Sequence, residues 1–148
     1  PEGWRAALNI GLAVAVVLLG MTIALVRVAP AAQRAAIGRE MPVDAVRWIV
    51  EERPDARVFN RYEWGGYLGL VRPGDPVFID GRADVYGDAI IRRYAETILL
   101  ELDPQAELDR HRIDTVLFSP DSSLGRWLDA NAEWRRGYTD AVAAVWIR

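Results

Sequence analysis

The feature that most constrains the fold of this chain is an uncharged apolar stretch near its N-terminus. Residues 6–26 contain no charged side chain, and Leu, Val, Ile and Ala dominate them. As a helix this stretch would measure about 32 Å, enough to cross a hydrocarbon core of about 30 Å. A helix also satisfies its own backbone hydrogen bonds in lipid. The stretch therefore predicts a transmembrane helix over residues 6–27, with the lipid bilayer as its partner.

A signal peptide and a buried helix of a soluble protein are the alternatives. The apolar region of a signal peptide is about 7–15 residues long and precedes a cleavage site of small residues. Pro30-Ala31-Ala32 resembles such a site faintly, but the apolar stretch is longer than that. Trp4 and Arg5, just before the stretch, suit a membrane–water interface. A membrane span is thus favoured, and because the chain begins without Met we interpret it as a piece of a longer protein.

The rest of the sequence divides into a connector over residues 28–40 and a soluble domain over residues 41–148. From Glu40 onward there are 20 acidic residues and 14 arginines, a net charge of −6. This balance argues against a nucleic-acid partner. The chain has no Cys and only one His, His111. These counts exclude disulfides and thiolate metal sites and leave little scope for zinc or histidine-base chemistry, so we expect neither a metal nor a cofactor.

Short apolar runs alternate with helical patterns through the soluble domain. Helices are expected after Pro42, over residues 89–102 and 105–111, and around Trp127, with either a helical turn or a bent loop over 62–70. Strands are expected at Arg57–Asn60, Pro76–Asp80, Thr115–Phe118, Trp134–Thr139 and Val142–Ile147. This order predicts an α/β domain with a small, mostly parallel sheet and a C-terminal antiparallel hairpin.

Two loops that follow predicted strands gather polar and aromatic side chains. In an open α/β sheet, ligands bind beyond the carboxyl ends of the strands. A ligand site there would let Arg82 bind an anion and let Trp64 and Tyr67 stack on a sugar ring. The candidate ligand-binding residues are Glu63, Trp64, Tyr67, Asp80, Arg82, Asp84 and Tyr86. No catalytic residue and no metal ligand is predicted among them.

A purely structural interpretation of the same loops is the alternative. Asp80 and Arg82 would then pair with each other, Asp88 would cap a helix, and the aromatic side chains would fill the core. Asp80, Asp84 and Asp88 recur at intervals of four residues, but the nearby glycines make one continuous helix unfavourable there. His111, between two arginines at a helix end, is expected to be a surface or capping residue.

Four segments resemble one family of membrane proteins: RVFNRYEWGGYL, PVFIDGRADVYGD, IDTVLFSPDSSLGRWLD and YTDAVAAVWIR. They are similar to the C-terminal domain of bacterial multi-pass membrane proteins of the GT-C glycosyltransferase-like type. The segment Tyr62-Glu63-Trp64-Gly65-Gly66-Tyr67 also bears a faint similarity to the Trp-Trp-Asp-Tyr-Gly motif of the oligosaccharyltransferase catalytic subunit. Here one Trp is missing and Glu63 stands in place of Asp, so the resemblance does not imply binding of a glycosylation sequon.

The resemblance implies a location and a function. It implies a domain outside the cytoplasm, at the cell membrane, joined to further membrane helices of the parent chain. It also implies a domain that assists the binding of an acceptor or a lipid-linked sugar, while the catalytic acid lies elsewhere in a polyprenyl-phosphate-sugar-dependent enzyme. Arg27, Arg34 and Arg39 after the span favour the cytoplasmic side instead, and we give the resemblance more weight. The alternative function is a non-catalytic, membrane-tethered interaction or assembly module.

Overall fold

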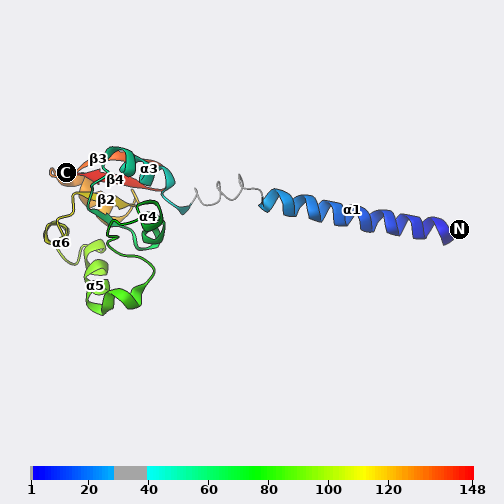
Figure 1. The fold of residues 1–148 in the computed structure, drawn as a ribbon, viewed down its shortest axis with the longest axis horizontal. Coiled ribbons are helices and arrows are strands. Elements are labelled where there is room, and N and C mark those ends of the chain that lie inside the picture. The colour runs from blue at the N-terminus through cyan, green and yellow to red at the C-terminus, as the bar shows by residue number, and fades with distance from the viewer. Residues whose placement is uncertain (1, 29–39) are drawn as a thin grey trace. The chain divides into compact units, whose positions relative to one another are not determined.

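The computed structural model describes residues 2–28 and 40–148, which fall into two compact units (Figure 1). Helix α1 (Glu2–Val28) belongs to the first unit, and all the other described elements belong to the second. The predicted connector over residues 28–40 lies outside the described residues except at its two ends. Each unit is therefore considered by itself.

Helix α1 confirms the predicted apolar helix. Its segment Gly3–Leu25 has a mean hydropathy of 2.4, and it is long and apolar enough to cross a membrane. Large apolar side chains along it are exposed, among them Leu8 at 62% and Leu19 at 62%. The hydroxyl of Thr22 donates a hydrogen bond of 2.8 Å to the carbonyl oxygen of Leu18, so this polar group is satisfied within the helix. An exposed apolar surface of this length is stable only where lipid or another apolar partner covers it.

The second unit contains helices, one 3-10 turn and four strands in an alternating order. In sequence they are α3 (Val43–Glu52), β1 (Val58–Asn60), η1 (Tyr62–Trp64), α4 (Gly65–Val71), α5 (Ala83–Ile98), α6 (Pro104–Arg110), β2 (Thr115–Phe118), α7 (Ser123–Ala130), β3 (Arg135–Thr139) and β4 (Ala144–Ile147). Side-chain caps set two helix starts, because Asp103 accepts from the Gln105 amide and Ser122 from the Gly125 amide. Helix α5 consists of two helices merged across a break at Gly87, where φ is 73°, and the second begins within one residue of the predicted start at Ala89.

The four strands form one mixed sheet in the order β1-β2-β4-β3. Strand β1 pairs with β2 in parallel, with Val58 opposite Thr115, whereas β4 pairs antiparallel with both β2 and β3. The α/β prediction is confirmed, but the prediction of a mostly parallel sheet is wrong. The C-terminal hairpin inserts β4 directly beside β2, so antiparallel pairings outnumber the single parallel one.

The predicted strand at Pro76–Asp80 is also wrong, because this segment joins no strand ladder. The side chain of Asn60, the last residue of β1, binds the segment instead. Its Nδ2 donates to the Ile79 carbonyl at 2.7 Å, and its Oδ1 accepts from the Phe78 amide at 3.2 Å. One buried side-chain amide thus substitutes for the backbone pairing that a neighbouring strand would provide.

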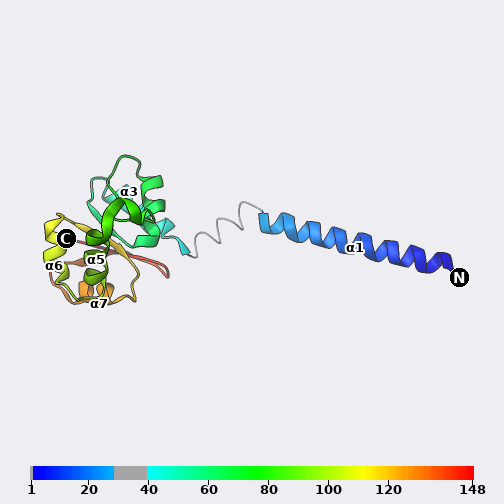
Figure 2. The same cartoon turned by 90° about the horizontal axis from the view of Figure 1, so that it is seen from below.

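Apolar side chains cover both faces of the sheet. Successive residues of a strand point to opposite faces, so Val116 and Trp146 pack in one cluster and Leu117 and Val145 in the other. The first cluster includes residues of α5, α6 and α7, and the second includes residues of α3 and α4. Figure 2 shows α5, α6 and α7 grouped together and apart from α3. The sheet is therefore the middle of three layers.

Candidate functional site

Asp80 and Arg82 of the predicted site form an ion pair with each other. Asp80 is buried, and its carboxylate accepts hydrogen bonds from the Arg82 amide at 3.0 Å and from the Arg82 Nη2 at 2.7 Å. These hydrogen bonds, more than any other cause, hold the pKa of Asp80 below its usual range despite its burial. The side chain of Arg82 is 70% exposed, and its fork-shaped guanidinium is engaged by this carboxylate.

The aromatic residues of the first loop lie in or against the core. Trp64 is 2% exposed, and its indole Nε1 donates to the Glu40 carbonyl at 3.0 Å. Tyr67 is half-buried and packs against the same cluster as Trp64. Glu63 is exposed and forms an ion pair of 2.8 Å with Arg61. Because Trp64 is enclosed, its ring offers no face for a sugar to stack on.

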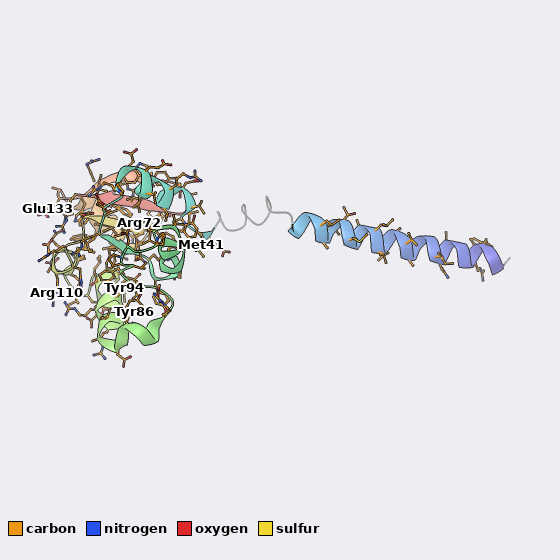
Figure 3. All side chains as sticks on the ribbon, viewed as in Figure 1. Met41, Arg72, Tyr86, Tyr94, Arg110 and Glu133 are labelled. Atoms are coloured by element: carbon orange, nitrogen blue, oxygen red, sulfur yellow. The ribbon has the colours of Figure 1, made fainter. Side chains whose placement is uncertain are left out.

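The remaining predicted residues belong to α5. Tyr86 is half-buried and packs against the cluster that includes α5, and Figure 3 shows it on the same helix as Tyr94. Burial and the nearby charge of Asp80 raise the pKa of Tyr86. The side chain of Asp84 lies outside the described part of the structure. Asp88 directly follows Gly87, the break between the two helices that make up α5.

The structure therefore brings Asp80, Arg82 and Tyr86 together and leaves Glu63 paired elsewhere. A close approach of two backbones holds this arrangement. A Cβ atom placed on Gly65 would lie 2.0 Å from the Ile79 carbonyl oxygen, so only Gly lets α4 begin this near to the segment before Asp80. The Asp80–Arg82 pair and the enclosed Trp64 are what the structural interpretation of these loops predicts. The ligand-binding role of the seven residues stays a prediction.

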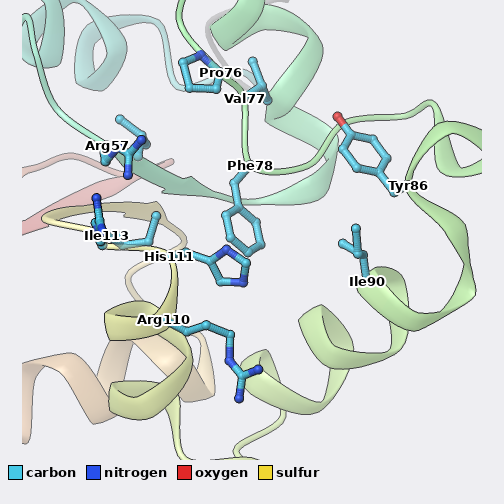
Figure 4. Close-up of a pocket in the computed structure, with 11 residues that line it drawn as sticks. Arg57, Pro76, Val77, Phe78, Tyr86, Ile90, Arg110, His111 and Ile113 are labelled. Carbon is cyan, nitrogen blue, oxygen red and sulfur yellow. The ribbon is translucent and has the colours of Figure 1, made fainter.

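An open pocket, whose wall includes Tyr86, extends to the residues that precede β1 and β2 (Figure 4). Arg57 and Ile113 precede β1 and β2, so the pocket is at the amino ends of the two parallel strands. Its volume is about 570 Å³, within the range typical of small-molecule sites. The lining residues come from four segments: Arg57, Val58, Pro76, Val77, Phe78, Tyr86, Ile90, Arg110, His111, Arg112 and Ile113.

The pocket combines an aromatic centre with cationic and apolar sides. The Phe78 ring meets the His111 ring edge-on, with the ring centroids 5.0 Å apart. In Figure 4, Arg57 lies on one side of Phe78, and Tyr86 and Ile90 lie on the other. Burial raises the pKa of Tyr86, so this residue lines the pocket as a neutral phenol at pH 7.

A buried carboxylate just outside the pocket pairs with Arg110 and contacts His111. Glu107 is 4% exposed, and it lies 3.3 Å from the Arg110 Nε and 3.2 Å from the His111 Nε2. It also accepts two hydrogen bonds from Arg93, and these hold the pKa of Glu107 below its usual range. His111 is the C-cap residue of α6, which confirms the capping position predicted from the sequence.

The two other arginines of the pocket have no such partner. Among the described residues, neither Arg57 nor Arg112 forms an ion pair or a side-chain hydrogen bond. None of the described residues that line the pocket is acidic, although the domain as a whole carries a net charge of −6. The pocket is therefore a local concentration of positive charge on an acidic domain.

Sequence reasoning missed this pocket because the rule on strand ends pointed to the other edge of the sheet. Tyr86 is the only predicted residue among those that line it in the described structure. The run Arg110-His111-Arg112 and the placement of Arg57 directly before a strand were the available signals. Within residues 2–28 and 40–148, no group of three or more His, Cys, Asp or Glu side chains is arranged to hold a metal ion.

Comparisons with models of protein families, with curated proteins and with solved structures find no match for this chain. The assignment of a function therefore depends on the residues and their geometry. The resemblance to GT-C glycosyltransferase-like membrane proteins stays a hypothesis.

Proposed function

We propose that this chain is the C-terminal extracytoplasmic domain of a GT-C glycosyltransferase-like membrane protein. In this role the domain helps to bind an acceptor or a lipid-linked sugar, while residues elsewhere in the parent protein carry out catalysis. The resemblance of four sequence segments supports the family, and the apolar helix α1 supports a location at the cell membrane. Further membrane helices of the parent chain would complete the enzyme.

The observation that carries this proposal is the pocket lined by Arg57, Phe78 and Tyr86. A lipid-linked sugar presents a phosphate, hydroxyl groups and an isoprenoid chain. The pocket offers arginines for the phosphate, rings for the sugar and apolar side chains for the first part of the chain. An open pocket also favours ligand binding over the alternative of an interaction or assembly module.

The proposal is tested by ligand binding to the chain in nanodiscs. Nanodiscs with a polyprenyl-phosphate-linked sugar are compared with nanodiscs of the same lipid without it, and the melting temperature of the domain is measured. A ligand at a hundred times its Kd stabilises the folded state by about 2.7 kcal/mol. We expect an increase in melting temperature that depends on the ligand concentration, and no increase at saturating ligand would contradict the proposal.

A matched pair of variants locates the binding. Ile90 lines the pocket and is 46% exposed, whereas its neighbour Ala89 is exposed on the same helix and does not line the pocket. Ile90→Glu and Ala89→Glu add the same charge to α5. Ile90→Glu should abolish the ligand-dependent stabilisation and Ala89→Glu should preserve it. Equal effects of both variants would place the ligand elsewhere.

The side of the membrane is tested separately. Protease added outside intact spheroplasts should cleave the soluble domain, and protease added to inverted membrane vesicles should cleave it only after detergent is added. The reverse pattern would place the domain in the cytoplasm, as the arginines after the span favour.

A further inference from the structure

Helix α6 ends in a hydrogen-bond pattern that normally requires glycine. The Arg112 amide donates to the Asp109 carbonyl at 2.9 Å, and the Ile113 amide donates to the Leu108 carbonyl at 2.8 Å. These two bonds define a Schellman motif, in which the residue after the cap adopts left-handed backbone angles. That residue is Arg112, with φ of 52°. A side chain there is strained, because its Cβ crowds the following carbonyl oxygen.

Helix α5 ends in the same way with a different side chain. The Leu100 amide donates to the Thr97 carbonyl at 3.2 Å, and the Glu101 amide donates to the Glu96 carbonyl at 2.8 Å. Leu100 has φ of 63°, and it does not line the pocket. Arg112 and Leu100 are the non-glycine residues with positive φ in the described structure. The chain therefore contains two equivalent strained positions, of which only one lies at the pocket.

Arg112 combines a strained backbone conformation with a guanidinium that forms no ion pair among the described residues. Among the described residues no carboxylate pairs with Arg112 or Arg57, whereas Glu107 pairs with Arg110. Left-handed non-glycine residues cluster at functional sites, where a specific side chain outweighs the backbone cost. Glycine at this position would relieve the strain but remove the cation from the pocket.

The geometry points to a phosphate-binding subsite formed by Arg57 and Arg112. A guanidinium presents a planar fork of N–H donors that matches two oxygens of a phosphate. The part of the ligand next to the phosphate is apolar or a ring, since Phe78, Tyr86 and Ile90 continue the wall of the same pocket. The ligand class is thus a phosphomonoester or diphosphate joined to a ring or an apolar chain.

This inference deepens the proposed function and rests on it only for the source of the ligand. A phosphate of this kind is present on a lipid headgroup and also on a water-soluble sugar phosphate. Inorganic diphosphate, a soluble sugar diphosphate and a polyprenyl diphosphate in nanodiscs therefore form three arms of one titration. Binding of the soluble sugar diphosphate at least as tight as that of the lipid would assign a soluble source. Tighter binding of the lipid would assign a membrane source.

The decisive variants are Arg112→Gly and its control Leu100→Gly. Each should raise the melting temperature of the chain by about 4 °C, because each relieves one left-handed side chain. Arg112→Gly should weaken inorganic diphosphate binding about ten- to hundredfold, the effect of losing a charge-assisted hydrogen-bond pair. Leu100→Gly should leave the Kd within about twofold of the unchanged protein. If Arg112→Gly is more stable than the unchanged protein and still binds diphosphate less tightly, the weaker binding cannot result from unfolding.

Arg57→Gln gives a second measurement that does not involve the strained turn. It should weaken diphosphate binding to a similar extent and flatten the dependence of binding on salt. Unchanged diphosphate binding in both Arg112→Gly and Arg57→Gln would overturn the subsite. If the lipid-linked sugar still stabilised both variants, the proposed function would stand without the subsite. If diphosphate bound through both arginines but the lipid-linked sugar did not bind, the subsite would stand without the proposed function.

Discussion

Gly65 is the residue at which a single added methyl group should disrupt the fold most. It starts α4 with φ of −60° and ψ of −40°, angles that alanine adopts readily. The obstacle is spatial, because the new Cβ would lie 2.0 Å from the Ile79 carbonyl oxygen and 2.8 Å from the Asp80 Cα. These atoms belong to the backbone, so relief requires the segment before Asp80 to move by more than 1 Å.

The cost of Gly65→Ala follows from three contributions. Forcing an extra carbon into a packed region costs about 1–3 kcal/mol. Displacement of the segment also weakens the two Asn60 hydrogen bonds, each with a net contribution of about 1 kcal/mol. The higher helix preference of Ala than of Gly offsets about 0.5–1 kcal/mol of this loss of stability. We therefore expect Gly65→Ala to lower the free energy of unfolding by about 2–4 kcal/mol.

Gly66→Ala is the matched control. Gly66 is the next residue of α4, and a Cβ atom there would have no neighbour within 4 Å. This variant should stabilise the domain by about 0.5–1 kcal/mol through helix preference alone. Urea unfolding of the chain in detergent, followed by tryptophan fluorescence, measures both changes. Five of the six Trp residues lie beyond residue 40, so the signal reports on the domain. Equal stabilities of the two variants would refute the close approach at Gly65.

Three further changes test the contacts that surround the candidate site. Asn60→Leu leaves the Phe78 amide and the Ile79 carbonyl without their partner, and it should lower the free energy of unfolding by about 2–3 kcal/mol, measured in urea. Trp64→Phe removes the hydrogen bond to the Glu40 carbonyl and should cost about 1–2 kcal/mol, whereas a ligand-stacking Trp64 would show no loss of stability. Glu107→Gln should cost about 1–3 kcal/mol at pH 7, again measured in urea. Because the folded state lowers the pKa of Glu107, its contribution is present above about pH 4.3 and is lost as the pH falls through the folded pKa. The variant and the original protein should therefore differ little at pH 2, and an unchanged difference there would contradict the ion-pair role.

The elements best predicted from sequence were those with a strong local signal. Strand β2 (Thr115–Phe118) agrees with its prediction at both ends, because a run of β-branched and aromatic residues is bounded there by turn residues. The segment Pro76–Asp80 has similar composition and still forms no strand. Its partner is the side chain of Asn60, and local composition carries no information on such a distant contact.

The order of the strands could not be predicted for the same reason. The hairpin of β3 and β4 was predicted from two strands joined by a short link at Asp140-Ala141, but its docking beside β2 is a tertiary outcome. Gly137 illustrates this, because a Cβ there would lie 2.5 Å from the Trp48 ring of α3, across the bulge of β3. The geometry of the candidate site could not be predicted for the same reason. The residue types of the two loops were clear from the sequence, whereas burial of Trp64 and the position of the pocket depend on segments far apart in the chain.

The most direct test of the account is to map where diphosphate binds the intact chain. Backbone amide chemical shifts of the chain in detergent micelles are recorded while inorganic diphosphate is added. We expect the largest changes at the pocket, around Arg57, Phe78 and residues 110–113, and small changes around Glu63 and Trp64. Changes concentrated around Glu63 and Trp64, or no saturable change at the pocket, would contradict the proposed subsite.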